Sequence, residues 1–316
     1  MGLKNFPKGY TPSSSQQYAI PNILDAFKDN RFVVMQGPTG CGKSFIAKTI
    51  ANGLQKLPSR LSKIVSDYRA FETSRDNGKL VYEYADDFVN KNYGTSILTT
   101  TKALQDQYTR DFEDIKTLKG KSSYICNLDE RSLADAAPCT FSSKLKKECW
   151  DCNRCDYYEA KNKSITAKIS VESYSSFFHK PDHLKYRQLI VCDEASELEN
   201  IIVSRFSCSI ELNKLNKYSF SLLYSSNRNR FYNNLIKLQS ELEGRYVELL
   251  RMFEKHSETI SDAVKKEFKF IADLKGDLSL VIDTWQQSEY IINKAFNHNK
   301  KYIQLIPKKI DVLAQH

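Results

Sequence analysis

The chain has 316 residues, and 47 Lys and Arg against 38 Asp and Glu give it a formal net charge of +9. Hydrophobic residues make up 41% of the sequence, so we expect a folded protein of two or three domains rather than a disordered chain. No apolar stretch approaches the ~20 residues of a membrane-spanning helix. Residues 1–10 lack the apolar core of a signal peptide. We therefore expect a protein of the cytoplasm or nucleoid that is neither membrane-bound nor secreted.

The first elements in chain order predict a strand, a loop and a helix. Apolar residues at helical spacing over 20–27 predict a short helix, and residues 32–35 form an apolar run typical of a strand. A Gly-rich turn follows, and residues 45–54 again have helical periodicity. This order of elements is the setting in which phosphate-binding loops occur.

The turn between that strand and that helix matches the pattern G-x-x-x-x-G-K-[ST]. Glycines let backbone N–H groups wrap around phosphate oxygens, and the helix N-terminus adds a favourable partial charge. The lysine is expected to reach the β- and γ-phosphates of ATP, and the serine hydroxyl to bind Mg²⁺. The predicted nucleotide-binding residues are Gly37, Pro38, Thr39, Gly40, Cys41, Gly42, Lys43 and Ser44.

Five of the eight cysteines lie close together, between residues 126 and 155. The spacing C-x-x-C-x-x-C suits an iron–sulfur cluster, but spacing alone leaves a four-sulfur zinc site equally open. A short polar segment has little core of its own, and a metal would stabilise it. Four of these five are the candidate ligands: Cys126, Cys139, Cys149, Cys152 and Cys155.

Strand-type runs at residues 96–99, 169–171 and 189–192 alternate with helical patterns. That alternation predicts an α/β unit with a mainly parallel sheet. The last run ends in Asp193 and Glu194, roughly 150 residues after the phosphate loop. In a nucleotide-hydrolysing sheet, such an Asp holds Mg²⁺ and the neighbouring Glu polarises the attacking water. Lys43, Asp193 and Glu194 are therefore the predicted catalytic residues.

The pattern changes after residue 200. Apolar residues at spacings of three and four predict helices over 231–253 and 260–274, and a third over 278–292. Residues 302–313 are expected to return as a strand and turn. The second half of the chain thus predicts a helical module.

Taken together, these motifs resemble the XPD/DinG-like branch of superfamily 2 iron–sulfur DNA helicases. The resemblance covers residues 6–200 and follows the order of that family's motifs. The matching segments are the entry segment with Gln16 or Gln17, the loop in DNRFVVMQGPTGCGKS, ILTTTKALQDQY (97–108), LKGKSSYIC (118–126), CDYYEAK (155–161), ISVESYSSFF (169–178) and QLIVCDEAS (188–196).

The resemblance implies roles for individual residues. Gln16 would read adenine, and Thr101 and Lys102 would contact nucleic-acid phosphates. The cysteines would hold a 4Fe–4S cluster beside the DNA strand, with zinc as the alternative. Two departures are clear: Ser196 stands where the family usually has His, and no G-R-x-x-R pattern follows residue 200. The second motor domain, which carries arginine fingers in that family, is thus not recognisable.

The expected fold is a RecA-like P-loop parallel sheet with a cysteine-rich metal-cluster insert and a helical arch insert. The expected function is an ATP-dependent DNA helicase, 5′-to-3′ by resemblance, or its N-terminal motor half. Expected partners are single-stranded or forked DNA and a second polypeptide that supplies the missing domain. The alternatives are a DNA-binding, ATP-binding regulatory subunit and a P-loop ATPase with a zinc insert. The predicted segments are 1–117 and 161–199 (RecA-like), 118–160 (cluster), 200–300 (arch) and 301–316 (return to the RecA-like domain).

Overall fold

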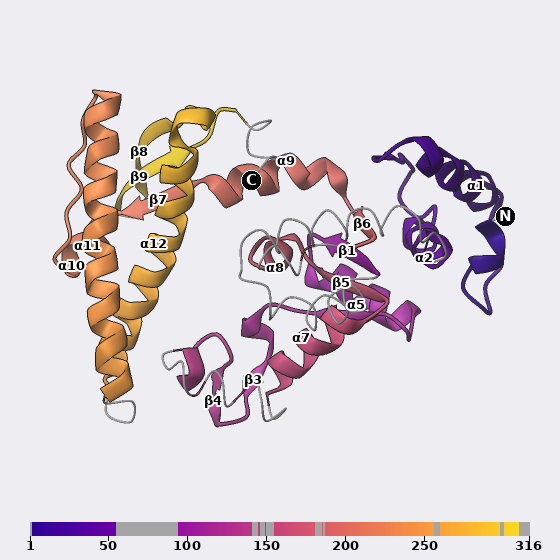
Figure 1. The fold of residues 1–316 in the computed structure, drawn as a ribbon, viewed down its shortest axis with the longest axis horizontal. Coiled ribbons are helices and arrows are strands. Elements are labelled where there is room, and N and C mark those ends of the chain that lie inside the picture. Colours follow the sequence, from indigo (N-terminus) through magenta and orange to yellow (C-terminus); the bar gives the residue numbers. More distant parts are fainter. Residues whose placement is uncertain are drawn as a thin grey trace, which may run out of the picture. The chain divides into compact units, whose positions relative to one another are not determined.

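The structure is a computed structural model, and Figure 1 shows its ribbon. It divides into two compact units. Unit 1 comprises Met1–Tyr124 and Cys155–Glu194, and unit 2 comprises Ile125–Arg154 and Ala195–His316. The residues that the structure describes are 2–54, 94–140, 145, 149, 155–180, 185, 187–255, 260–297 and 300–309.

Unit 1 is built on a four-stranded sheet in the order β2-β5-β1-β6, and every pairing in it is parallel. The predicted α/β unit with a parallel sheet is therefore confirmed. Three strands that were expected from apolar runs, over 96–99, 169–171 and 189–192, form at the expected places, and β2 is a further strand that was not expected. The strands are β1 (Thr95–Thr99), β2 (Lys116–Leu118), β5 (Ile169–Ser173) and β6 (Leu189–Cys192).

One face of this sheet carries the core of unit 1. Ile97, Ile169 and Val171 point into a single cluster, which also takes in Ile20, Ile46 and Tyr108 from three helices. Because neighbouring strands in register present alternate residues to the same face, these apolar positions meet on one side. The helices and turns of unit 1 are η1 (Gly2–Asn5), α1 (Ser14–Asp29), α2 (Lys43–Leu54), α5 (Lys102–Asp111), η2 (Lys121–Ser123), α7 (Asp156–Thr166) and α8 (Tyr174–Phe178).

The strand that was predicted over residues 32–35 is not present. In the described part of the chain, residues 32–38 pair with no strand, and Phe32 and Val34 are 80% and 91% exposed. A strand needs a neighbour for its backbone N–H and C=O groups, and the edge strand β6 pairs only with β1 among the described residues. The prediction from the apolar run alone was therefore wrong.

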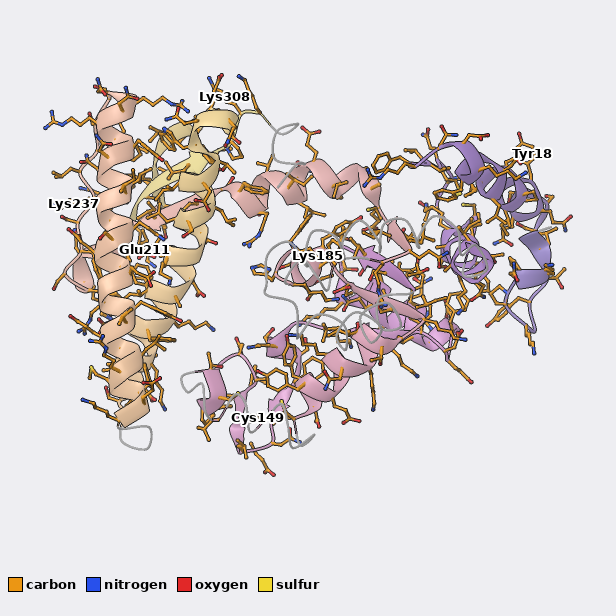
Figure 2. All side chains as sticks on the ribbon, in the orientation of Figure 1. Tyr18, Cys149, Lys185, Glu211, Lys237 and Lys308 are labelled. Atoms are coloured by element: carbon orange, nitrogen blue, oxygen red, sulfur yellow. The ribbon has the colours of Figure 1, made fainter. Side chains whose placement is uncertain are left out.

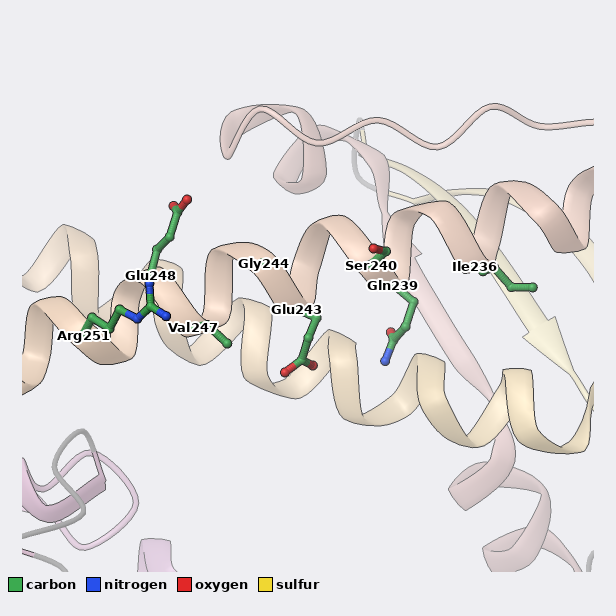
Figure 3. Close-up of a pocket in the computed structure, with 8 residues that line it drawn as sticks. All are labelled: Ile236, Gln239, Ser240, Glu243, Gly244, Val247, Glu248 and Arg251. Atoms are coloured by element: carbon green, nitrogen blue, oxygen red, sulfur yellow. The ribbon is translucent and has the colours of Figure 1, made fainter.

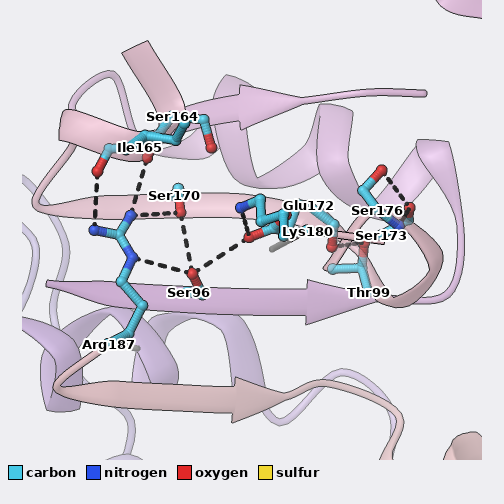
Figure 4. Close-up of polar contacts among 10 residues, drawn as sticks. All are labelled: Ser96, Thr99, Ser164, Ile165, Ser170, Glu172, Ser173, Ser176, Lys180 and Arg187. Atoms are coloured by element: carbon cyan, nitrogen blue, oxygen red, sulfur yellow. Dashed lines mark hydrogen bonds and ion pairs between the residues drawn. The ribbon is translucent and has the colours of Figure 1, made fainter. Parts of the chain in front are cut away.

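The other face of the sheet carries a buried polar network (Figure 4). Lys180 donates to the Oε1 atom of Glu172 at 2.6 Å, and both side chains are almost fully buried. Ser96 also donates to that oxygen, at 3.3 Å. The guanidinium of Arg187 donates to Ser96 and Ser170 and to the last carbonyls of α7, Ser164 O and Ile165 O. Arg187 thus ties two strands to a helix C-terminus, where a positive charge is favourable.

Unit 2 contains two long helices that lie side by side, α11 (Arg228–Lys255) and α12 (Asp262–Ser288) (Figure 1). Their apolar stripes form one core with a three-stranded antiparallel sheet in the order β7-β9-β8. The helical module that was predicted after residue 200 is thus present, together with a sheet. The remaining elements are β3 (Ile125–Cys126), β4 (Asp129–Leu133), η3 (Pro138–Thr140), η5 (Ala195–Glu197), α9 (Leu198–Phe206), β7 (Cys208–Glu211), α10 (Leu212–Lys217), β8 (Ile291–Asn297) and β9 (Lys300–Ile306).

Two predictions for this half differ from the structure. The helices that were expected over 260–274 and 278–292 are one helix, α12, because Leu274 and Leu278 continue a single buried stripe past the open position of Gly276. An exposed glycine costs only about 1 kcal/mol in a helix. Ile292 lies in β8 instead. The described part of 301–316 pairs with β7 and β8 in unit 2, whereas we had expected a return to the RecA-like domain.

Within the described part of the chain, none of the helices combines the length and apolar composition that a bilayer crossing requires. Figure 2 shows that charged and polar side chains cover the long helices of unit 2.

The buried pair between Lys180 and Glu172 gives a stability prediction. Lys180→Ala leaves the Glu172 carboxylate buried without its cation, so we expect the free energy of unfolding to fall by about 3–5 kcal/mol. The matched control is Lys163→Ala, which breaks the exposed pair with Glu159 and should cost at most about 1 kcal/mol. Urea denaturation followed by circular dichroism measures both. Equal losses in the two variants would contradict the proposed importance of burial.

Candidate nucleotide-binding site

The phosphate loop of unit 1 turns sharply at two glycines before α2 begins at Lys43. Gly40 and Gly42 have φ angles of 82° and 77°, a backbone conformation that side chains with a Cβ rarely adopt. The amides of Phe45 and Ile46 both donate to Gly42 O, which anchors the loop to the first turn of the helix. Gly40 and Gly42 are therefore at positions where the loop geometry favours glycine.

Lys43 folds back over the loop. Its Nζ atom donates to Gly37 O at 3.2 Å and to Pro38 O at 3.4 Å. A lysine ammonium has three donors and no acceptor, and these carbonyls take up two of the three. The same ammonium lies where the loop closes, which is the position from which it can exchange carbonyl partners for phosphate oxygens.

Gln16 lies directly against the loop and is only 7% exposed. Its Nε2 atom donates to Cys41 O at 3.3 Å and to Gly42 O at 3.4 Å. Its Oε1 atom accepts from the backbone of Ser13, which completes a capping box at the start of α1. The structure thus gives Gln16 backbone partners in the loop and the cap, and its adenine-reading role stays a prediction.

The acidic pair lies at the carboxyl end of β6. The parallel pairing of β6 with β1 continues one step beyond the strand, because the amide of Asp193 donates to Leu98 O at 3.0 Å. Glu194 follows with a φ of 55°, a left-handed conformation that costs a residue other than glycine roughly 1–2 kcal/mol. Such strain in a sheet-end turn occurs often at functional sites.

Three side chains from neighbouring segments hold this pair in place. Tyr108 of α5 donates to the Oδ2 atom of Asp193 at 3.1 Å, and Tyr174 donates to the backbone oxygen of Asp193 at 2.8 Å. Thr100, just after β1, donates to the carboxylate of Glu194. Burial raises the pKa of the Tyr108 phenol well above its ordinary value, and the charge of Asp193 adds to this effect. The phenol is therefore a permanent donor at neutral pH.

These supporting residues were not among the predicted site residues. Tyr108 is the last residue of the segment ILTTTKALQDQY and lies in α5, the helix that follows β1. That placement is the signal that could have identified it. Thr101 caps α5 by accepting from the amide of Leu104, and Lys102 is the first residue of that helix. Their proposed contact with nucleic acid stays a prediction.

The loop and the acidic pair belong to the same unit. Phe45, from the first turn of α2, and Val191, from β6, both pack against the single core of unit 1. None of the described hydrogen bonds or ion pairs joins Lys43 or Ser44 to Asp193 or Glu194. A bound nucleotide with Mg²⁺ would fill that role, since the serine hydroxyl and the aspartate carboxylate are both oxygen donors of the type that Mg²⁺ prefers.

The predicted cysteine ligands are not assembled among the described residues. Cys126, Cys139 and Cys149 are buried in unit 2, Cys155 is half-buried in unit 1, and Cys152 lies outside the described residues. No group of three or more His, Cys, Asp or Glu side chains suited to a metal occurs in the part of the chain that the structure describes. The four described candidates therefore do not form a metal site among the described residues, and the cluster stays a prediction from the sequence.

A groove along α11 lies in unit 2, whereas the phosphate loop belongs to unit 1. Figure 3 shows the residues that line this groove. One helix supplies the residues that line it, and these include Glu243, Glu248 and Arg251. It has no glycine turn with positive φ and no helix N-terminus, so it lacks the features with which proteins bind phosphate.

Comparison with known proteins agrees with the interpretation of residues 37–44 as a phosphate-binding loop. Residues 16–172, just under half of the chain, match the model of a family described as Novel STAND NTPase 3. The match begins at Gln16 and ends at Glu172 in β5, so it includes the loop and stops before Asp193. A search of curated proteins finds no match to the chain. The matched region and the loop geometry both indicate a P-loop NTPase domain.

The contact between Gln16 and the loop can be tested with two matched glycine substitutions. Gly42→Ala adds a Cβ 2.1 Å from the Nε2 atom of Gln16, whereas Gly40→Ala adds one with nothing within 4 Å. Both positions have a similar positive φ, so both variants carry similar backbone strain. Displacing Gln16 loses two hydrogen bonds, so we expect Gly42→Ala to weaken ADP binding about tenfold more than Gly40→Ala.

Titration with a fluorescent ADP analogue measures this difference. In a Gln16→Ala background the clash is removed, and the two glycine variants should then bind ADP equally. A difference that persists in that background would show that Gln16 does not support the loop.

Tyr108 gives a second prediction at this site. Tyr108→Phe removes the hydrogen bond to the carboxylate of Asp193, a bond of the kind worth about 1.5–3 kcal/mol. We expect the Mg²⁺ concentration for half-maximal nucleotide hydrolysis to rise about tenfold, because Asp193 loses its fixed orientation. Tyr157→Phe is the control, since Tyr157 is half-buried and makes no described bond to the acidic pair. An unchanged Mg²⁺ dependence in Tyr108→Phe would refute the role.

Proposed function

We propose that the chain is an ATP-dependent motor of the DNA-helicase type, or the N-terminal half of one, in which unit 1 hydrolyses ATP. The observation that supports this most strongly is the pairing, within one unit, of a phosphate loop at the start of α2 with two carboxylates at the end of a parallel strand. Ligands of open α/β sheets bind at the carboxyl ends of the strands, which is where Asp193 and Glu194 lie.

In the proposed reaction, water attacks the γ-phosphorus of ATP, the bond to the β-phosphate oxygen breaks, and ADP and phosphate leave. Ser44 and Asp193 would hold Mg²⁺, which neutralises charge on the phosphate oxygens. The Lys43 ammonium would exchange Gly37 O and Pro38 O for phosphate oxygens. Glu194 would orient the water, and the Thr100 hydroxyl would fix that carboxylate.

The helicase part of the proposal rests on the order of the sequence motifs. Thr101 and Lys102 follow β1 at the same sheet edge as Asp193, so nucleic acid bound there would lie next to the acidic pair. The Thr101 side chain accepts from the amide of Leu104, and a phosphate at this helix N-terminus would meet further backbone amides of the first turn. A second polypeptide that supplies arginine fingers remains part of this proposal, and the iron–sulfur cluster stays a prediction from the sequence.

A second candidate is a regulatory subunit that binds ATP and DNA without unwinding. Ser196 at the family's histidine position favours it. So does the lack of a G-R-x-x-R pattern after residue 200, the mark of the second motor domain in that family. A P-loop ATPase with a zinc insert is the third candidate, and it predicts no response to DNA.

The proposal is tested by ATP hydrolysis with and without a single-stranded oligonucleotide. We expect DNA to stimulate hydrolysis, and Lys43→Ala to reduce it by at least about 100-fold, as loss of a positioned charge does in other enzymes. The control is Lys28→Ala, which removes an exposed lysine of α1. Hydrolysis that survives in Lys43→Ala would overturn the assignment of the loop.

Hydrolysis without any response to DNA would leave an NTPase and refute the motor. A strand-displacement assay on a forked duplex separates the first two candidates. Unwinding by the chain alone contradicts the regulatory subunit, and DNA-stimulated hydrolysis without unwinding supports it.

A further inference from the structure

The hairpin formed by β8 and β9, here called the basic ribbon (residues 291–306), is positively charged and exposed along much of its length. Residues 291–309 contain five lysines and no Asp or Glu. Two of the five pair with carboxylates, Lys300 with Glu211 and Lys309 with Glu289. Among the described contacts, no ion pair involves Lys294, Lys301 or Lys308. Figure 2 labels Lys308 beyond the end of the ribbon.

The register of the ribbon places an aromatic ring between two lysines on one face. Phe296 is directly opposite Lys301, and Lys294 is opposite Ile303. Residues opposite each other, and residues two apart in a strand, share a face of the sheet. Lys294, Phe296 and Lys301 therefore lie together on the face that carries Ile303.

This face changes character along its length. Ile303 is 2% exposed and packs in the core of unit 2, while Phe296, nearer the turn, is 68% exposed. Tyr224, from the segment before α11, lies under Lys294, with the ammonium 3.6 Å from the ring centroid, and is itself 42% exposed. The exposed part of the face thus presents two aromatic rings and two ammonium groups.

Lysines on an edge strand often serve only to prevent pairing with another chain. An exposed phenylalanine on the same strand works against that purpose, because it favours association. A ring flanked by cations is, however, the combination with which proteins bind single-stranded nucleic acid, since bases stack on the ring while the cations contact phosphates.

We propose that the basic ribbon binds single-stranded nucleic acid, with a base stacked on Phe296 and backbone phosphates against Lys294 and Lys301. For its partner this inference rests on the proposed function, which requires a nucleic-acid strand, and it adds a contact surface in unit 2. Binding at the ribbon needs no nucleotide and no hydrolysis, so it can be measured separately from the motor.

The test is fluorescence anisotropy of the full chain with labelled oligo(dT) and oligo(rU), without ATP. Stacking on one ring is worth about 1–3 kcal/mol per base, so we expect Phe296→Ala to raise Kd about 5- to 150-fold and Phe296→Trp to preserve it. Because Phe296 is exposed, its loss should leave the melting temperature unchanged.

The lysines are tested through the salt dependence of binding. Lys294→Ala and Lys301→Ala should each reduce the slope of log K against log salt by about 0.7, the value for one phosphate contact on a single strand. Lys237→Ala is the matched control, because Lys237 is an exposed lysine of the same unit on α11. It should leave both Kd and the slope unchanged.

Several outcomes would overturn the proposal. One is wild-type Kd in Phe296→Ala together with unchanged slopes in both lysine variants. Another is displacement of the oligonucleotide by heparin as effectively as by unlabelled oligonucleotide, together with no effect of Phe296→Ala. That result would show that binding depends on charge attraction alone. Binding to anionic vesicles without binding to either oligonucleotide would show that the ligand of the ribbon is a membrane surface and not nucleic acid. Equal Kd values for the two oligonucleotides would show that the ribbon does not distinguish DNA from RNA. A lower Kd for one of them would identify the preferred nucleic acid.

The two proposals fail in different ways. If ribbon variants bind normally while the wild type shows DNA-stimulated hydrolysis, the ribbon proposal is wrong and the motor stands. If the ribbon variants lose binding but hydrolysis never responds to DNA, the ribbon stands and the motor does not.

Discussion

The parallel ladder between β1 and β6 is the constraint on which the candidate site depends. It aligns the ends of two strands that are almost a hundred residues apart in sequence, so that Thr100 meets Glu194 and α5 brings Tyr108 to Asp193. Parallel strands have their carboxyl ends at the same edge of the sheet, so polar residues placed just after each strand gather there. Without this pairing, neither carboxylate would have its hydrogen-bonding partners.

The sequence predicted those elements whose signal is local. The glycine pattern of the loop, the apolar runs of β1, β5 and β6, and the stripe of α11 each depend on residues close in sequence. Predictions failed where the outcome depended on distant partners. The apolar run at 32–35 pairs with no strand among the described residues, and Ile292 lies in a hairpin instead of a helix. The contact of Tyr108 with Asp193 was not predicted for the same reason, since it depends on the pairing of two strands that are distant in sequence.

Gln16 shows how a residue can be found by pattern and still have different contacts from those expected. A side-chain amide has two N–H groups and one oxygen, and here both carbonyl contacts of the nitrogen lie in the loop while the oxygen caps α1. Reading adenine would require some of these bonds to be exchanged. The amide therefore links the position of α1 to the conformation of the loop, so a movement of one would change these hydrogen bonds to the other.

Two lysines of this chain, Lys43 and Lys294, have different surroundings. Lys43 rests on backbone carbonyls inside a closed loop, which suits a compact phosphate group, whereas Lys294 rests on an aromatic ring at the surface, which suits an extended strand. The chain connects the two regions directly, because the backbone after Glu194 continues through η5 and α9 into β7, which pairs with β9 of the ribbon. The strained turn at Glu194 begins that connection. A change of backbone conformation there on hydrolysis would therefore act at the first residue of the segment that leads to the ribbon sheet.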